Sequence, residues 1–199
     1  MTRTLLLWGG IGIAFLFAAG WWWYDATHVP EPIRSDCVWE TMAQYPLTDT
    51  SGQPVAPLSF KGRVVLLDFI YTRCPSVCPR LQSRLHAVLS HLPPSDKLVA
   101  VSISLDPERD TPLYLATYAE SYRVPGQRWL FLRPASQKWV IQLATKVFDL
   151  TAAPLEGEEI LHSDAILLID CAGRIRGVYS SEDDRLLTHA SKLLQLCAR

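Results

Sequence analysis

Runs of apolar residues, interrupted by short polar turns, mark the buried strands of this chain. Residues 64–71 are apolar at every position except Asp68, which predicts a strand buried on both faces. Residues 97–105 and 129–132 are mostly apolar and predict two more core strands. Residues 165–170 and 174–179 flank a short turn at Cys171-Ala172-Gly173 and predict a hairpin.

Helical spacing follows each of the first three strands. After Pro79, leucines and valines recur at three- and four-residue intervals until Pro93-Pro94, which predicts a helix between these prolines. A second helix is expected from Pro112 to about Tyr122, with Asp110 or Thr111 as its cap. Residues 136–148 and 183–197 predict two further helices.

The order of these elements predicts the fold class. Strand and helix alternate three times, and a hairpin and a last helix follow. Early βαβ units closed by an antiparallel hairpin indicate an α/β fold with a mixed sheet flanked by helices, the thioredoxin-like arrangement. In such sheets the loop after the central strand, residues 72–79, lies at the edge where ligands bind.

The first 24 residues form a separate apolar segment. No charged residue occurs from Thr4 to Tyr24, and about 20 apolar residues match the thickness of a bilayer core. We expect a transmembrane anchor at 1–24, a linker and lead-in at 25–44, and the thioredoxin-like domain at 45–199. Arg3 places the N-terminus in the cytoplasm by the positive-inside rule.

A cleaved signal peptide, with a small-residue site at Ala18-Ala19-Gly20, is the alternative to the anchor. Both interpretations place the domain outside the cytoplasm. Because no Arg- and Ser-rich transit segment precedes the apolar run, we expect the inner membrane of a bacterium, crossed once, with the domain in the periplasm.

The net charge and the number of cysteines limit the classes of function that the chain can have. The formal net charge of −1 offers no basic field, which argues against nucleic-acid binding. The chain has five cysteines, an odd number, in a compartment where thiols oxidise. Outside the Cys74/Cys78 pair, one disulfide is expected to join Cys37 to Cys197, because terminal segments often lie close together. Alternatively Cys37, Cys171 and Cys197 are small buried apolar residues.

The candidate chemistry lies at Cys74 and Cys78, each followed by a proline. A residue before proline favours extended geometry, so we place Cys78 at the N-cap of the helix and Cys74 in the loop before it. The helix N-terminus stabilises thiolate. Two thiolates with one imidazole suit copper, and Cu(I) in particular, whereas a structural zinc site needs a fourth strong ligand.

A third ligand must come from a distant histidine. His162 precedes a core strand on the side of the fold where the thioredoxin-like sheet meets the helix N-terminus, so it is the candidate, although a lone histidine is more often structural. His86 and His91 on the cysteine helix, His189 on the last helix and His28 in the linker are expected to be structural or surface residues.

Three motifs in order resemble the Sco/SenC family of copper chaperones. The resemblance covers about residue 45 to the C-terminus. The motifs are Phe69-Ile70-Tyr71-Thr72-Arg73-Cys74-Pro75-Ser76-Val77-Cys78-Pro79, then Ser102-Ile103-Ser104-Leu105-Asp106-Pro107-Glu108-Arg109-Asp110-Thr111-Pro112, and His162-Ser163 before an apolar strand.

The resemblance implies that Cys74, Cys78 and His162 bind copper. It further implies that the protein delivers copper to, or reduces the cysteines of, the dinuclear copper site in cytochrome c oxidase subunit II. Other copper carriers or thiol reductants would be further partners. Asp106 occupies an acidic position of the family near the site, where it is a candidate for docking a partner. Alternatively, Asp106 is an acid that stabilises the turn and caps the helix.

Two other functions remain open from the residues. A thiol-disulfide oxidoreductase would use Cys74 and Cys78 as a redox-active pair on extracytoplasmic proteins. The CxxxC spacing, and His162 where thioredoxins carry a proline, favour metal binding over this exchange. A peroxidase of the peroxiredoxin type is weaker, because Cys78 would compete for the sulfenic acid formed on Cys74.

Overall fold

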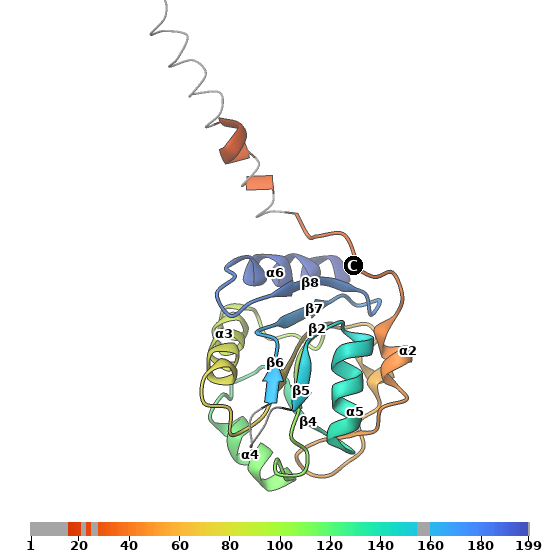
Figure 1. Ribbon diagram of the computed structural model, residues 1–199. Coiled ribbons are helices and arrows are strands. Elements are labelled where there is room, and N and C mark those ends of the chain that lie inside the picture. Colours follow the sequence, from red (N-terminus) through yellow and green to blue (C-terminus); the bar gives the residue numbers. More distant parts are fainter. Residues whose placement is uncertain (1–15, 21–22, 25–27, 155–159, 199) are drawn as a thin grey trace, which may run out of the picture.

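The computed structural model describes residues 16–20, 23–24, 28–154 and 160–198. A six-stranded sheet of order β1-β4-β3-β2-β7-β8 forms the centre, with helices on both faces (Figure 1). Its strands are β1 Leu47–Thr48, β2 Val64–Ile70, β3 Leu98–Ser104, β4 Trp129–Pro134, β7 Ile166–Ile169 and β8 Ile175–Tyr179. A two-stranded sheet contains β5 Ala152–Pro154 and β6 Ile160–His162. The helices are α2 Val38–Met42, η1 Pro57–Phe60, α3 Val77–His91, α4 Pro112–Glu120, α5 Gln137–Gln142, the π-helical η2 Leu143–Val147, and α6 Arg185–Cys197.

Strand β2 is central because all seven of its residues are buried. It pairs in parallel with β3 and antiparallel with β7, and β3 pairs in parallel with β4. Alternate residues of β2 pack into two apolar clusters, one shared with α3 and α6 and the other with α2 and α5. The predicted mixed sheet flanked by helices is confirmed.

The start of α3 differs from the sequence prediction. The helix begins at Val77 with Ser76 as its N-cap, so Cys78 lies in the first turn rather than at the cap. Pro79 is tolerated there because the first four N–H groups of a helix have no intrahelical acceptor. The helix therefore starts two residues earlier than the prolines suggested.

The predicted disulfide between Cys37 and Cys197 was wrong. Cys197 is bonded to Cys171, with an S–S length of 2.07 Å, and Cys37 is a free thiol. Cys37 packs against the cluster on the α2 side of the sheet, whereas Cys197 packs against the cluster on the α6 side. Cys37 lies against the turn between β7 and β8, where the Val38 N–H donates to the Gly173 carbonyl, but the end of α6 reaches Cys171 in that turn.

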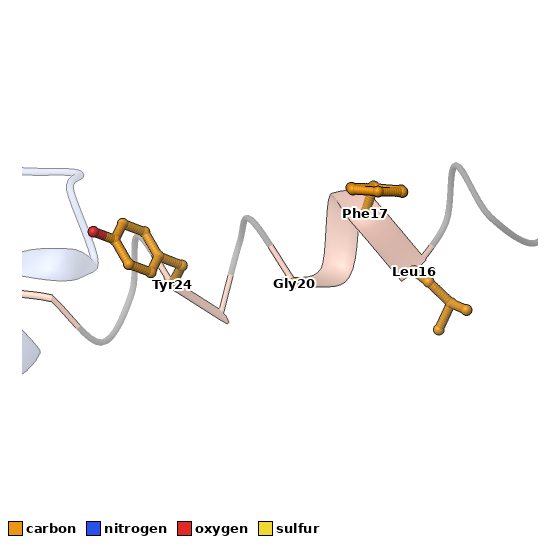
Figure 2. A pocket seen from close by; sticks show the side chains of 4 residues that line it. All are labelled: Leu16, Phe17, Gly20 and Tyr24. Carbon is orange, nitrogen blue, oxygen red and sulfur yellow. The ribbon is translucent and has the colours of Figure 1, made fainter.

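Most of the predicted anchor lies outside the described residues. No helix in the described ranges is both long enough and apolar enough to cross a bilayer. Leu16, Phe17, Gly20 and Tyr24 line an open apolar hollow on the segment that leads away from the domain (Figure 2). None of these four lining residues carries a thiol, imidazole or carboxylate.

Candidate metal centre

Cys74, Cys78 and His162 converge at one edge of the sheet. Their ligand atoms all lie within 4.8 Å of one another. The Nε2 atom of His162 is 3.4 Å from Cys78 Sγ and 3.8 Å from Cys74 Sγ. The three residues come from the loop after β2, the first turn of α3 and the end of β6. The structure therefore brings together the three residues that the sequence analysis singled out.

The cysteine loop is short and turns directly into α3. The backbone N–H of Cys74 donates to the Tyr71 carbonyl, which closes a turn just beyond β2. The backbone N–H of Cys78 points at Cys74 Sγ, 3.4 Å away. This N–H is one of the unsatisfied donors at the helix N-terminus, so it stabilises negative charge on the sulfur.

His162 is the last residue of β6, not a loop residue as expected from the sequence. It pairs with Ala152 across the β5–β6 hairpin. Its Nδ1 lies 3.2 Å from the Ser163 carbonyl, so an N–H at Nδ1 can donate there and leave the Nε2 lone pair facing the sulfurs. The Tyr71 ring meets the imidazole edge-on, with centroids 5.7 Å apart, and limits its rotation.

The two thiols have opposite proton affinities. The hydrogen bond from the Cys78 side chain lowers the pKa of Cys74 far below its ordinary value, and His162 and the N–H groups of Cys78 and Ser76 add to this effect. The same bond raises the pKa of Cys78, as does its burial. The metal-free pair therefore holds one thiolate on Cys74 and one proton on Cys78. Burial, with the Cys74 charge, raises the pKa of Tyr71 to about 12, so its hydroxyl stays neutral.

A pocket of about 170 Å³ opens onto the centre. Cys74 and His162 line it, whereas the Cys78 side chain is completely buried behind them. Leu161, next to His162, also lines the pocket and is exposed. An ion or the thiol of another molecule would therefore reach Cys74 before Cys78.

Asp110 fixes the cysteine loop, a role that the sequence analysis did not assign to it. Its carboxylate accepts hydrogen bonds from the Thr72 hydroxyl and the Ser104 hydroxyl, both at 2.6 Å, and from the Thr72 backbone N–H at 3.2 Å. Thr111, not Asp110, caps α4. Asp110 thus ties the loop after β2 to the end of β3, and no motif spacing reveals this contact.

Asp106 lies outside the group of three ligand atoms. Its side chain is almost fully buried and forms ion pairs with Arg73 at 3.5 Å and Arg109 at 3.3 Å. Its backbone N–H donates to Ser104 Oγ. These contacts make Asp106 a structural acid of the β3–α4 turn that also holds Arg73, the residue before Cys74.

The other four histidines lie elsewhere, as expected. His86 Nδ1 contacts the Tyr122 carbonyl, and His91 Nδ1 contacts the carbonyl one helical turn before it. His189 is buried and its Nδ1 lies 2.7 Å from the Tyr179 hydroxyl. His28 stacks on the Tyr24 ring. Each has a local structural partner, and none of them belongs to the three-ligand group.

Known proteins resemble this chain in both sequence and structure. A SCO1 protein homolog of Bacillus subtilis (strain 168) is 27% identical over 175 residues, which cover 87% of this chain and 86% of the homolog. The mitochondrial SCO2 homolog of Mus musculus is 33% identical over 192 residues, covering 89% and 72% of the two chains.

Two solved structures extend the comparison. A SCO1/SenC family lipoprotein from Bacillus anthracis str. Ames superposes with a TM-score of 0.73 at 21% identity, over 86% of this chain and all of that one, and shows the shared fold. ScoI of Bradyrhizobium japonicum, solved with copper bound, has a TM-score of 0.62 at 26% identity, over 84% and 99% of the two chains. The model of the SCO1/SenC family matches residues 38–196 of this chain, which therefore belongs to that family.

Proposed function

We propose that Cys74, Cys78 and His162 bind one copper ion, which the protein passes to the dinuclear copper site of cytochrome c oxidase subunit II or a similar acceptor. The observation that carries this proposal is the convergence of two sulfurs and one imidazole nitrogen within 4.8 Å. Membership of the SCO1/SenC family and the copper-bound structure of ScoI support it.

The donor set fits copper better than zinc. Two soft thiolates and one imidazole suit Cu(I), and a closed structural zinc site would need a fourth strong ligand. With Cys78 buried behind it, Cys74 on the pocket side can meet the ion first. Cys78 then loses its proton, and His162 supplies Nε2. Because the pocket leaves Cys74 accessible, a thiol of the acceptor can approach the bound ion and take it over.

We also propose where in the cell the protein lies. Residues 1–24 would anchor the protein in the bacterial inner membrane, 25–44 would lead away from it, and the copper-binding domain at 45–199 would face the periplasm. The uncharged stretch from Thr4 to Tyr24 and its length support the anchor. The lead-in ends with α2, whose Val38, Trp39 and Met42 are completely buried in the domain.

A thiol-disulfide oxidoreductase is the second candidate function. The thiolate on Cys74 faces the pocket, and the protonated Cys78 lies beside it in the position of a resolving thiol. Cys74 could attack a disulfide of an extracytoplasmic protein, and Cys78 could then displace that protein and close the Cys74–Cys78 disulfide. The two functions can coexist, because only the reduced pair binds metal.

Copper titration of the reduced full chain in detergent distinguishes these functions. We expect one Cu(I) per chain against a chromophoric competitor, and loss of this binding in both Cys74→Ala and Cys78→Ala. Cys37→Ala, which removes a thiol outside the centre, is the matched control and should bind like the wild type. Tight binding retained in either site variant would refute the centre. Absence of copper binding together with rapid exchange against a protein disulfide would favour the oxidoreductase.

A further inference from the structure

A carboxyl group lies buried beneath the metal centre and is not one of its ligands. Asp68 interrupts the apolar strand β2 and has no exposed surface. The side-chain N–H of Gln82, also fully buried, donates to Asp68 Oδ2 at 2.5 Å. Ser102 lies opposite Asp68 on β3. A fully buried carboxyl in an apolar strand, with only the Gln82 amide and the Ser102 side chain as hydrogen-bonding neighbours in the described part of the chain, needs a physical explanation.

The second side-chain oxygen of Asp68 and that of Gln82 bear on whether Asp68 is protonated. Within the described residues, neither Asp68 Oδ1 nor Gln82 Oε1 has a hydrogen-bond partner, and both are buried. In an ionised Asp68 both atoms are acceptors, and each unsatisfied atom costs about 1–3 kcal/mol. A proton on Asp68 Oδ1 converts that atom into a donor, which Gln82 Oε1 can accept. Protonation therefore offers a partner to both atoms at once.

The surroundings also favour the neutral acid. Burial raises the pKa of Asp68 to about 7, despite the opposing effects of Ser102, His162 and Gln82. Two other titratable groups face it, Cys78 from α3 and Tyr118 from α4. The Tyr118 hydroxyl is buried and makes no hydrogen bond within the described chain, so it does not stabilise a carboxylate here. The neighbouring strand β7 presents the apolar Ile166 opposite Asp68.

Asp68 is close enough to influence the centre through charge. Cys78 and Gln82 are four residues apart on α3, so they share one face of the helix and Asp68 lies about one turn from Cys78. A negative Asp68 opposes a thiolate on Cys78. If Asp68 were ionised, the dithiolate form would hold three negative charges in a largely buried space against the single charge of Cu(I).

We propose that Asp68 and Gln82 form a buried acid–amide pair, which keeps Asp68 neutral while Cys74 and Cys78 are both thiolates and thereby sets how tightly the centre holds Cu(I). Asp68 is a positioning residue in this scheme, because it touches no metal and acts through the charge state of Cys78. The copper part rests on the proposed function, whereas the protonation of Asp68 can be measured without copper.

Carbon NMR of the metal-free, reduced full chain with ¹³C-labelled aspartate carboxyls tests the pair directly. One carboxyl resonance, absent from Asp68→Asn, should remain protonated to about pH 7, whereas ordinary aspartates titrate near pH 4. A midpoint below about pH 5 for this resonance would overturn the proposal. If Asp68→Asn does not fold, sequential assignment of the wild-type spectrum identifies the resonance instead.

Copper affinity supplies the second readout. At about pH 6, where Asp68 is neutral, wild type and Asp68→Asn should bind Cu(I) equally, and at about pH 8.5 the variant should bind about tenfold tighter. Asp96→Asn, which changes an exposed aspartate just before β3, is the control and should follow the wild type at both pH values. If the ratio of the Cu(I) affinities of Asp68→Asn and wild type were the same at both pH values, the effect of Asp68 on copper binding would be refuted. If no variant binds copper, the proposed function fails, and the NMR result still decides the protonation of Asp68.

Discussion

At the scale of single residues, the imidazole of His162 and the two sulfurs make different contributions to the centre. Thiolates alone can hold the soft Cu(I) ion, whereas Cu(II) depends more on nitrogen ligands. We therefore expect His162→Ala to weaken Cu(II) binding at least about tenfold more than Cu(I) binding. Competition titrations in each oxidation state, with the visible thiolate-to-Cu(II) absorption recorded, measure the difference.

His86→Ala is the matched control for this prediction. The Nδ1 atom of His86 contacts the backbone carbonyl of Tyr122, just after α4, and His86 lies outside the three-ligand group. Its replacement should leave both affinities and the Cu(II) spectrum unchanged. An unaltered Cu(II) spectrum in His162→Ala would instead make His162 a structural residue.

The charge on Cys74 gives a prediction for pH. Because the pKa of Cys74 is lowered in the folded protein, its thiolate contributes stability at pH values above the ordinary thiol pKa, and this contribution disappears as the pH falls through the lowered value. At about pH 5, iodoacetamide should therefore alkylate Cys74 in the folded, metal-free protein. Cys78, whose pKa is raised, should not react.

Mass spectrometry of the alkylated peptides identifies the modified sulfur. Cys37, half-buried and outside the centre, is the internal reference against which the labelling of Cys74 is measured. Equal labelling of Cys74 and Cys37 would contradict the lowered pKa of Cys74.

At the scale of elements, the position of the cysteine loop depends on the turn that follows β3. Replacement of Asp110 by Ala removes the acceptor for two Thr72 donors and for the Ser104 hydroxyl. Buried donors left unpaired in this way should lower the free energy of unfolding by about 3 kcal/mol. Cu(I) affinity should fall as well, because the loop that carries Cys74 is no longer fixed. Denaturant unfolding and copper competition measure the two effects.

Thr111→Ala separates loop fixation from helix stability. Thr111 caps α4, the helix that follows Asp110, by accepting a hydrogen bond from the Tyr114 N–H. Loss of a cap costs about 1 kcal/mol of unfolding free energy. This variant should be less stable but should bind copper normally. If it loses copper affinity as strongly as Asp110→Ala, the effect of Asp110 arises from α4 and not from its bonds to Thr72.

Elements with strong periodicity could be predicted from the sequence, and elements made by long-range pairing could not. Strands β2 and β3 are buried throughout and mostly apolar, and α3 has a regular apolar face, so each was expected from its own residues. The hairpin of β5 and β6 has only three residues in each strand, too few for a clear alternation. His162 was therefore expected in a loop, although its place near the cysteines was anticipated.

At the scale of the whole molecule, the cysteines of the centre could be placed from the sequence, whereas the disulfide, which depends on long-range packing, could not. The order of strands and helices specified a thioredoxin-like sheet, and that topology brings Cys74, Cys78 and His162 to one edge. The disulfide depended on which face of the sheet each terminal segment covers. Proximity of the chain ends cannot reveal the face, so the pairing of Cys37 with Cys197 was wrong.

The disulfide and the metal centre lie at opposite ends of the sheet. In the antiparallel pairing of β2 and β7, Ile169, just before Cys171, lies opposite Val65 near the start of β2, whereas the cysteine loop follows the end of β2. The bond joins residues 26 positions apart. Loss of a closed loop of this size should cost about 3 kcal/mol of unfolding free energy.

Cys197→Ser should therefore lower stability by that amount in denaturant titrations without reductant, and Cu(I) affinity should remain that of the wild type. Cys37→Ser is the matched control, because it removes a thiol that forms no disulfide, and its stability should change little. Under reducing conditions wild type and Cys197→Ser should become nearly equal in stability, since both then lack the bond. A loss of copper affinity in Cys197→Ser would show that the two ends of the sheet are coupled, against the separation that their positions predict.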